Sequence, residues 1–346
     1  MTLKEIARQA NVSISTVSRV INGKSPSAAS PEVQQRILSI AQSSGYTPNA
    51  AAQDLKNKGR LQSAQRADQS IAVLFARMPF ALMDPYFSQL MQSIEAAVSD
   101  TGYYIKYMYS SADFDNPSIL QAFTEDKMKG IIILGRCEKR IVDYLTRTQV
   151  NLVYVGLNEF NPNYDQVLCN GYDVAFEAVG YLVRQGHRNI GYVGESENEV
   201  RYKGYCAALA ANGIELNPDY KVEVVLSSEG GYAGARKIMS QSKGITALFC
   251  ANDMTAIGAM RALKEDGYRI PDDISIIGID DIPTSQYMSP ALTTVHIPIE
   301  ELGNMTVKLL IDRIEGKHSL PVKVLLPFSI VERETCIPQA EPGSAK

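Results

Sequence analysis

The chain has 346 residues, of which 45% are hydrophobic and 21% are charged. This composition is ordinary for a folded protein in water, and the length predicts two or three domains. No apolar run approaches the ~20 residues that a membrane-spanning helix needs. Lys4, Glu5 and Arg8 interrupt the apolar stretch that a secretory signal would carry. We therefore expect a cytoplasmic protein with no role at a membrane.

The cysteines and histidines predict neither disulfides nor a metal site. The five cysteines are odd in number, widely spaced and mostly set in apolar segments, which favours buried, reduced thiols. His187, His296 and His318 have no cysteine or histidine neighbour at the spacing of metal ligands. We expect no metal ion and no cofactor.

The net charge of −4 conceals an uneven distribution. Residues 1–60 contain eight basic and three acidic residues, whereas the remainder contains 26 basic and 35 acidic residues. A cationic N-terminal part on an acidic body suggests a polyanionic partner for the N-terminal part alone. Many charged faces are merely solvated, so this indication depends on the motifs.

Residues 3–21 have the pattern of two short helices joined by a tight turn. Thr2 and Glu5 have the spacing of a capping box, and the first helix has one apolar face. The residues on that face are Leu3, Ile6, Ala7 and Ala10. In the turn, Val12 can fill the angle between the helices, and Ser13 can cap the second helix. The segment is therefore predicted to be a helix-turn-helix.

The second helix has an apolar inner face and a small, hydroxyl-rich outer face. The inner residues are Val17, Val20 and Ile21, before Asn22 and Gly23 end the helix, and the outer residues are Ile14, Ser15, Thr16, Ser18 and Arg19. Hydroxyls can bind phosphates or base edges, Ile14 can contact a thymine methyl, and Arg19 can bind guanine O6 and N7. A helical bundle with a solvated polar face is the alternative. The small, cationic face favours DNA binding in the major groove.

A third helix is expected after this pair. Ser30 can cap it, Pro31 suits its first position, and Gly45 ends it. Its core-facing residues are Val33, Ile37, Ile40 and Ala41.

These segments resemble the lactose-repressor family of bacterial transcriptional regulators. The resemblance rests on Thr2-Leu-Lys-Glu-Ile-Ala, on Thr16-Val-Ser-Arg-Val-Ile-Asn22 and on Gly45-Tyr-Thr-Pro-Asn49, and it extends to about residue 335. It implies a DNA-binding headpiece over residues 1–59. The headpiece residues expected at the DNA are Thr2, Ser13, Ile14, Ser15, Thr16, Ser18, Arg19, Asn22, Tyr46 and Asn49.

The resemblance also implies a hinge helix at about residues 49–57 that enters the DNA minor groove. Leu55 matches the residue that wedges open a base step, and Ala52 matches the small residue that packs on the second copy. Apolar wedges kink DNA at a cost of a few kcal/mol, which closer contacts offset. A helix of about seven residues is marginal alone, so its folding can depend on DNA. Gln53, Asp54 and a longer loop at 24–29 depart from the family pattern and leave the operator sequence open.

Residues 60–69 are polar and without periodicity, which predicts a linker. Short apolar strands then alternate with amphipathic helices in two series, which predicts an α/β body of two doubly wound parallel sheets. The first series has strands near 71–75, 105–109, 131–134 and 152–155, with helices near 87–101, 116–129 and 140–147. The second has strands near 190–193, 222–226, 247–250 and 275–279, with helices near 173–185, 199–212, 231–240 and 254–266.

The resemblance implies that this body, residues 70–338, has the bilobed fold of periplasmic sugar-binding proteins. The chain is expected to cross between the lobes near 160, 296 and 322. The first lobe would then contain residues 70–160 and 297–322, and the second lobe 161–296 and 323–338, followed by a tail at 339–346.

Candidate effector-binding residues follow predicted strand ends, where parallel sheets bind ligands. Arg201 matches the family arginine that binds sugar hydroxyls, although a surface salt bridge is the alternative. Asn252 and Asp280 match effector-contacting positions, while Asp253 can simply cap a helix. Leu226 stands where some sugar-binding relatives have an aromatic residue. The complete predicted set is Asp84, Tyr86, Phe87, Glu159, Arg201, Asn252 and Asp280.

The sequence therefore predicts a homodimeric repressor of sugar-utilisation genes, with double-stranded operator DNA and a small sugar as partners. Residues 281–295 and Tyr164-Asp165 are most similar to the family's galactoside regulators, the branch of the evolved-β-galactosidase repressor, which favours a galactoside. Effector binding is expected to change the angle between the lobes and thereby the folding of the hinge. No leucine heptads follow Cys336, so a tetramerising helix is not expected.

Three alternatives stay open. An enzyme would carry a phosphate-binding glycine loop, a Gly-x-Ser-x-Gly elbow or a histidine paired with a nucleophile, and we find none, so no enzyme is expected. A transport binding protein would share the body fold but lack the DNA-binding headpiece. A regulator of the same family could respond to a purine corepressor or a phosphorylated protein partner instead of a sugar.

Overall fold

The structure is a computed structural model that describes residues 3–21, 29–43, 69–76, 84–116, 119, 125, 128–148 and 150–339. The chain divides into two compact units, Met1–Ala67 and Asp68–Lys346. Several predictions fall outside the described residues. These are the hinge helix, nearly all of the linker, most of the helix near 116–129, and the DNA-contact positions Thr2, Asn22, Tyr46, Asn49, Ala52 and Leu55.

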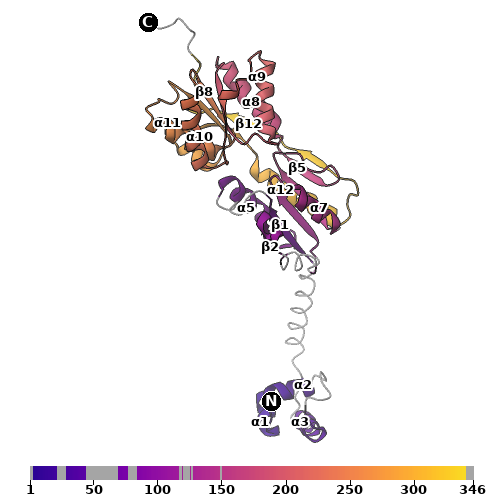
Figure 1. Ribbon diagram of the computed structural model, residues 1–346. Helices are drawn as coiled ribbons and strands as arrows, with labels where there is room; N and C mark the ends of the chain where they lie inside the picture. Colours follow the sequence, from indigo (N-terminus) through magenta and orange to yellow (C-terminus); the bar gives the residue numbers. More distant parts are fainter. Residues whose placement is uncertain are drawn as a thin grey trace. The chain divides into compact units, whose positions relative to one another are not determined.

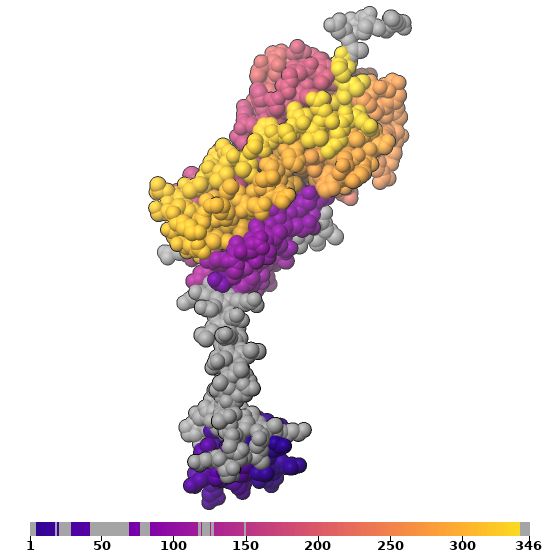
Figure 2. All heavy atoms as spheres, turned by 180° about the vertical axis from the view of Figure 1, so that it is seen from behind, coloured from indigo at the N-terminus to yellow at the C-terminus, as the bar shows by residue number. Residues whose placement is uncertain are grey.

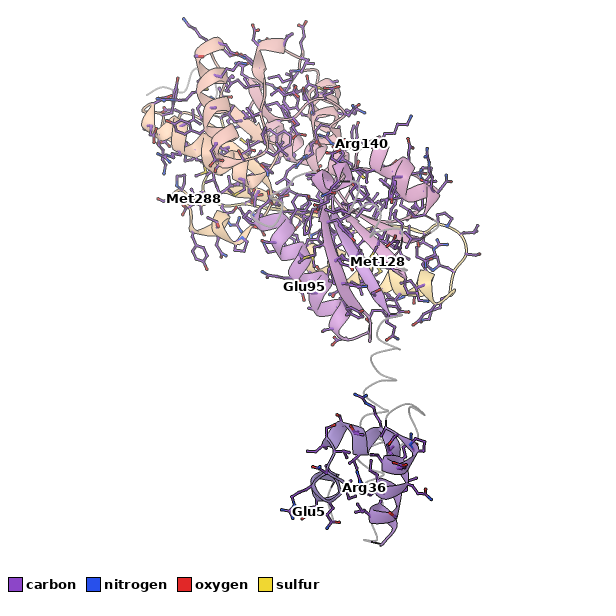
Figure 3. All side chains as sticks on the ribbon, turned by 60° about the horizontal axis from the view of Figure 1, so that its bottom comes forward. Glu5, Arg36, Glu95, Met128, Arg140 and Met288 are labelled. Carbon is purple, nitrogen blue, oxygen red and sulfur yellow. The ribbon has the colours of Figure 1, made fainter. Side chains whose placement is uncertain are left out.

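The headpiece has the three predicted helices, α1 (Leu3–Ala10), α2 (Ile14–Ile21) and α3 (Pro31–Ser43). Their shared core contains Ile6, Ala7, Ala10, Val17, Ile37 and Ala41, with Val12 packed against it. The Ser13 hydroxyl accepts a hydrogen bond from the Thr16 backbone N–H at 3.1 Å, so Ser13 caps α2 as predicted. Arg36 on α3 (Figure 3) donates to the Ala10 carbonyl at 3.0 Å and ties α3 to the end of α1.

The body contains two six-stranded sheets, as the alternating pattern predicts. The first has the strand order β11-β5-β4-β3-β1-β2 and the second β12-β10-β9-β8-β6-β7. All neighbouring strands are parallel except β12, which runs antiparallel to β10. The first sheet consists of β1 (Ser70–Phe75), β2 (Tyr104–Ser110), β3 (Gly130–Leu134), β4 (Asn151–Gly156), β5 (Asp165–Leu168) and β11 (Lys323–Leu325). The second consists of β6 (Ile190–Gly194), β7 (Lys221–Glu223), β8 (Ala247–Cys250), β9 (Ser275–Asp280), β10 (Thr293–His296) and β12 (Ser329–Val331).

Helices cover both faces of each sheet (Figure 1), so the central strands are buried on both sides. In the first lobe α5 and α12 pack on the face that carries Ile71 and Val73, and α7 packs on the face that carries Leu74. In the second lobe α8 and α9 cover one face, and α10 and α11 cover the other. The bounds are α5 (Pro85–Ser99), α7 (Lys139–Arg147), α8 (Gly171–Arg184), α9 (Val200–Ala211), α10 (Ser228–Gln241), α11 (Asp253–Glu265) and α12 (Ile299–Ile314). The described residues also form three short 3-10 helices, η2 (Ser111–Asp115), η3 (Pro218–Tyr220) and η4 (Pro283–Tyr287).

The chain passes between the sheets three times, but two of the predicted positions are wrong. The predicted crossing near 296 agrees with the step from β10 to α12. The crossings predicted near 160 and 322 are too early, because β5 and β11 pair with each other in the first sheet. The chain leaves the first sheet only after Leu168 and again after Leu325. Figure 2 shows the C-terminal residues, in yellow, extending over both lobes.

A buried carboxylate explains why residues 165–168 and 323–325 stay in the first lobe. Asp165, fully buried, accepts hydrogen bonds from two Arg313 nitrogens at 2.7 and 2.8 Å and from the Val322 N–H at 2.7 Å. The His318 Nε2 atom lies 2.9 Å from Asp165 Oδ2. Burial alone would raise the pKa of Asp165, but these contacts hold that pKa below its usual value. Asp165 therefore joins β5, the end of α12 and the start of β11.

Each helix in the described ranges is too short or too polar to span a lipid bilayer. All five cysteines are free, and Cys169, Cys250 and Cys336 are buried.

We predict that Asp165→Asn lowers the free energy of unfolding by about 3 kcal/mol at pH 7, because breaking a buried ion pair leaves charge uncompensated. The lowered pKa means that this stabilisation is present above about pH 4 and is lost as the pH falls through the folded-state pKa. Urea unfolding of both proteins from pH 7 to about pH 3 measures this. As a control, Asp266→Asn removes a surface ion pair with Arg236 and should lower the free energy of unfolding far less than Asp165→Asn does. If the difference in the free energy of unfolding between Asp165→Asn and the wild type stays constant with pH, the prediction is contradicted.

Candidate ligand-binding pocket

A pocket of about 50 Å³ lies between the two lobes of the body. Its walls come from the carboxyl ends of strands and the starts of the helices that follow, which is where parallel sheets bind ligands. The first lobe contributes Asp84, Tyr86, Phe87, Gly135, Arg136, Gly156, Leu157 and Asn158, and the second contributes Arg201, Leu226, Asn252 and Asp280.

Six of the seven predicted effector residues line this pocket, and Glu159 does not. The Glu159 side chain is 69% exposed and forms an ion pair with Lys323 of β11. Asn158, one residue earlier, lines the pocket in its place. Glu159 therefore lies outside the pocket, contrary to the prediction. The sequence indicates the right loop, after β4, but not which side chain of the loop turns inward.

Arg201 is a buried residue and not a surface ion pair. Its side chain is 4% exposed and that of Glu199 is 0% exposed. Arg201 donates from Nε to Glu199 Oε1 at 2.8 Å, from Nη2 to Glu199 Oε2 at 3.0 Å, and from Nη1 to the Ala251 carbonyl at 2.8 Å. Burial lowers the pKa of Arg201, but the carboxylate of Glu199 more than offsets this and leaves that pKa above its usual value. The guanidinium is thus fixed, charged, at the pocket wall.

Close packing of α9 against α8 holds Arg201 in place. Gly204 lies one turn after Arg201, and a Cβ there would lie 2.3 Å from the Tyr172 carbonyl oxygen. Only glycine permits this approach of the two helices.

Two buried polar atoms at the pocket, the Tyr86 hydroxyl and Asn158 Oδ1, have no hydrogen-bond partner among the described residues. Burial, followed by the charge of Asp280, raises the pKa of Tyr86 well above its usual value, so the hydroxyl keeps its proton at neutral pH. Leaving a buried polar group unpaired costs about 1–3 kcal/mol. A ligand that donates to Asn158 and exchanges a hydrogen bond with Tyr86 would recover that free energy.

Side chains that cap helices fix other parts of the wall. Asp84 accepts from the Tyr86 N–H at 2.9 Å and caps α5, and Asn252 accepts from the Thr255 N–H at 3.0 Å and caps α11. Asn252, and not Asp253, is therefore the cap. Asp253 is fully buried and accepts hydrogen bonds from the Ile282 N–H at 3.0 Å and from Ser285 and Thr294 at 2.6 and 2.5 Å.

The backbone at Asp280 is strained. Asp280 has φ 119° and Asp281 has φ 58°, both in a region that non-glycine residues rarely adopt. Asp281 accepts from Arg333 at 2.6 Å, and its other oxygen lies 3.0 Å from a His296 ring nitrogen. Strain of this kind concentrates at functional sites, and here the two contacts of Asp281 hold Asp280 at the pocket wall.

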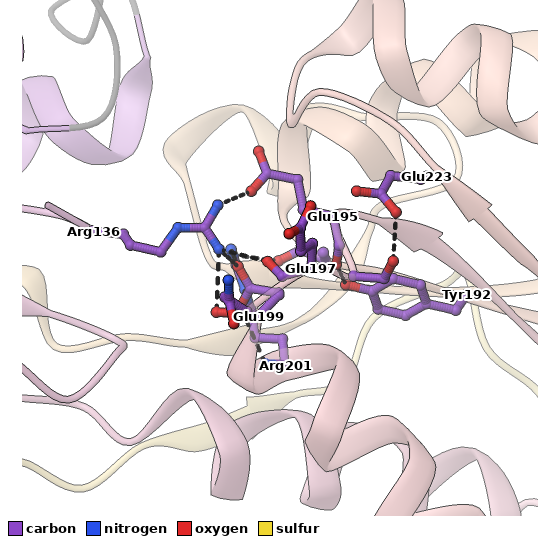
Figure 4. A network of polar contacts seen from close by, with 10 residues as sticks. Arg136, Tyr192, Glu195, Glu197, Glu199, Arg201 and Glu223 are labelled. Carbon is purple, nitrogen blue, oxygen red and sulfur yellow. Dashed lines mark hydrogen bonds and ion pairs between the residues drawn. The ribbon is translucent and has the colours of Figure 1, made fainter. Parts of the chain in front are cut away.

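The sequence did not indicate Arg136, which lines the pocket from the end of β3. Figure 4 shows its guanidinium reaching the segment before α9 in the second lobe. Nη2 donates to Glu195 Oε2 at 2.5 Å, and Nη1 donates to the carbonyls of Glu197 and Asn198 at 3.1 and 3.2 Å. Arg136 follows a strand end, as the other candidate residues do, and this position in the sequence could have indicated that Arg136 lines the pocket. Its partners, 59 or more residues away, were not visible in the sequence.

No group of three or more His, Cys, Asp or Glu side chains in the described ranges is arranged to hold a metal ion.

The outer face of α2 in the headpiece is open to solvent. Ser13, Ser15 and Arg19 are exposed, Ile14 is 47% exposed, and Thr16 is half-buried. The hydroxyls of Ser15 and Thr16 lie 2.7 and 2.8 Å from that of Ser13. The Ser18 side chain lies outside the described part of the chain.

Comparison with known proteins agrees with both units. Residues 2–49 match the lacI family of bacterial regulatory proteins, and residues 179–336 match a periplasmic binding protein-like domain. The ribose operon repressor of Haemophilus influenzae is 32% identical over 339 residues, which cover 96% of this chain and 98% of that protein. The transcriptional repressor PurR of Pasteurella multocida is 31% identical over 323 residues, covering 91% and 92%. The lac repressor dimer bound to operator and the anti-inducer ONPF has a TM-score of 0.70 and 26% identity, covering 97% of this chain and 99% of that one.

The fold and these matches define a transcriptional repressor with a helix-turn-helix headpiece and a ligand-binding body. The chain belongs to the lacI family of bacterial regulatory proteins.

Proposed function

We propose that this repressor binds its operator as a homodimer and that one small sugar in the pocket between the lobes controls its affinity for DNA. The observation that carries the proposal is the composition of the pocket wall. It combines the apolar side chains of Phe87 and Leu226 with a fixed guanidinium and with two buried polar atoms that have no partner in the described part of the chain. A sugar ring has matching apolar faces and a rim of hydroxyl donors and acceptors.

The charges of the lining favour a neutral ligand. Two arginines, Arg136 and Arg201, face two aspartates, Asp84 and Asp280, and Glu199 already pairs with Arg201. An anionic ligand would meet these carboxylates, and a cationic ligand would meet the guanidiniums. A neutral polyol with several hydroxyls can bind both kinds of group without leaving a charge uncompensated.

For the identity of the sugar we propose a galactoside, with ribose as its main competitor. Residues 281–295 resemble the galactoside regulators of the family, and they include Asp281, which holds Asp280 at the pocket. The relative named for the ribose operon is similar over nearly the whole chain. The PurR relative makes a purine the candidate of another chemical class.

Control of DNA binding follows from the position of the pocket between the lobes. A ligand that contacts both lobes favours one angle between them, and that angle sets the spacing of the first lobes in a dimer. The hinge around Leu55, which lies outside the described residues, would fold or unfold with that spacing. Coupling between two such sites is typically about 1–3 kcal/mol. Control of DNA affinity by a bound ligand needs no chemical turnover, and we propose that the chain has no enzymatic activity.

The sugar site is tested by thermal shift of the full chain with D-galactose, lactose, D-ribose, adenine, guanine and hypoxanthine. A true ligand at 100 times its Kd adds about 2.7 kcal/mol of stability.

We predict that Tyr86→Phe weakens binding of that ligand about tenfold, because one hydroxyl contact is lost. The matched control Tyr172→Phe, on the exposed surface of α8, should bind normally. A purine as the sole ligand, or unchanged binding by Tyr86→Phe, would contradict the sugar proposal.

Headpiece binding is tested with DNA that the full chain selects from a random pool. We predict that Arg19→Ala weakens binding to the selected DNA by about ten- to a hundredfold, because a guanidinium to guanine contact is worth about 1–3 kcal/mol. Arg8→Ala removes the same charge from the exposed face of α1 and serves as the control. Fluorescence anisotropy at one fixed salt concentration measures both variants. Equal losses in the two variants would mean that Arg19 contributes only charge.

A further inference from the structure

Arg136 separates the inner pocket from a much larger space outside it. This vestibule has a volume of about 910 Å³ and is lined by Ala76, Arg136, Cys137, Glu138, Lys139, Glu195, Glu197, Asn198, Glu223, Val224 and Val225. The inner pocket has about 50 Å³. Of the residues described as lining either space, only Arg136 lines both. Its side chain is therefore the partition between them.

The partition is built from both lobes. Arg136 follows β3 in the first lobe, whereas its acceptors among the described residues lie between β6 and α9 in the second lobe (Figure 4). The guanidinium donates to one carboxylate and two carbonyls, and its side chain is only 31% exposed. Because the planar guanidinium donates to three acceptors, the orientation of the Arg136 side chain is fixed far better than in a simple surface ion pair.

The same contacts lead to the ligand-binding arginine. Arg136 Nη1 lies 3.7 Å from Glu199 Oε2, the oxygen that accepts from Arg201 Nη2 at 3.0 Å. Glu199 is thus a buried carboxylate between two guanidiniums, one from each lobe. Moving Arg136 away takes one positive charge from a buried anion, so the position of Arg136 and the state of the pocket are energetically connected.

We propose that Arg136 is the gate and the size filter of the effector pocket. When the Arg136 side chain is in its closed position, it encloses a ligand of one sugar ring. A longer glycoside would extend into the vestibule through the position of the Arg136 guanidinium, so it must displace that guanidinium. This inference rests on the proposed function of the pocket as a sugar site. Arg136 acts on the ligand by closing the pocket and by limiting its length.

The closing role is tested without any ligand, by hydrogen–deuterium exchange of the full chain. In Arg136→Gln the lobes lose their bridge, and peptides covering residues 193–203 should exchange at least tenfold faster than in the wild type. Arg136→Lys keeps the charge but loses the fork and should be intermediate. The matched control is Arg140→Gln (Figure 3), because Arg140 pairs with Asp115 and Glu138 in its own lobe. Equal exchange in Arg136→Gln, Arg140→Gln and wild type would overturn the gate.

The size filter is tested by calorimetric titration of D-galactose and of lactose, which carries a second ring, into wild type and Arg136→Gln. The ratio of lactose affinity to galactose affinity should rise at least tenfold in Arg136→Gln. A merely structural role would weaken both sugars in proportion, and an unchanged ratio would overturn the filter. If neither sugar binds either protein, the size filter fails together with the galactoside proposal, and the exchange experiment alone decides the gate.

Discussion

A buried carboxylate between two guanidiniums is the interaction on which the ligand-binding body depends. Glu199 caps α9, pairs with Arg201 at 2.8 Å within its own lobe, and lies 3.7 Å from Arg136 of the other lobe. Removing either arginine would leave a buried negative charge less well compensated, which costs several kcal/mol in proteins. The arrangement fixes the ligand-facing guanidinium and joins the two lobes at one point. Binding and lobe closure are therefore expected to change together.

The two parallel sheets determine where the Glu199 interaction lies in the body. Parallel strands end at the same edge, so the loops after β3 and β4 face those after β6, β8 and β9 across one cleft. Helix caps such as Asp84 and Asn252, and the strained backbone of Asp280, then fix side chains at that edge. Most of the pocket wall is therefore fixed by the two sheets and the helix caps. The Arg136 side chain crosses from the first lobe to contact the second lobe at this wall. This combination suits the proposed role of the site, in which binding of a small polyol changes the angle between the lobes.

Elements with strong local signals were predictable from the sequence. Caps and apolar periodicity identified the three headpiece helices, and buried apolar runs identified the central strands of both sheets. The short strands β5, β10, β11 and β12 were missed, because their pairing depends on distant contacts such as Asp165 with Arg313, 148 residues apart. The pocket followed the same division. The residues predicted at strand ends line the pocket, whereas Glu159 does not and Arg136 was missed. Side-chain direction and interlobe partners are tertiary properties that the sequence does not show.

We propose that the pocket and the DNA-binding headpiece share one coupling free energy. The direct measurement is the Kd of the identified sugar for the full chain, free and saturated with its selected DNA. Thermodynamic reciprocity predicts that DNA changes the sugar Kd by the same factor by which the sugar changes the DNA Kd, within about 5–150-fold. The Tyr86→Phe protein should keep that factor while binding the sugar more weakly. An identical sugar Kd in the presence and absence of DNA would contradict the account.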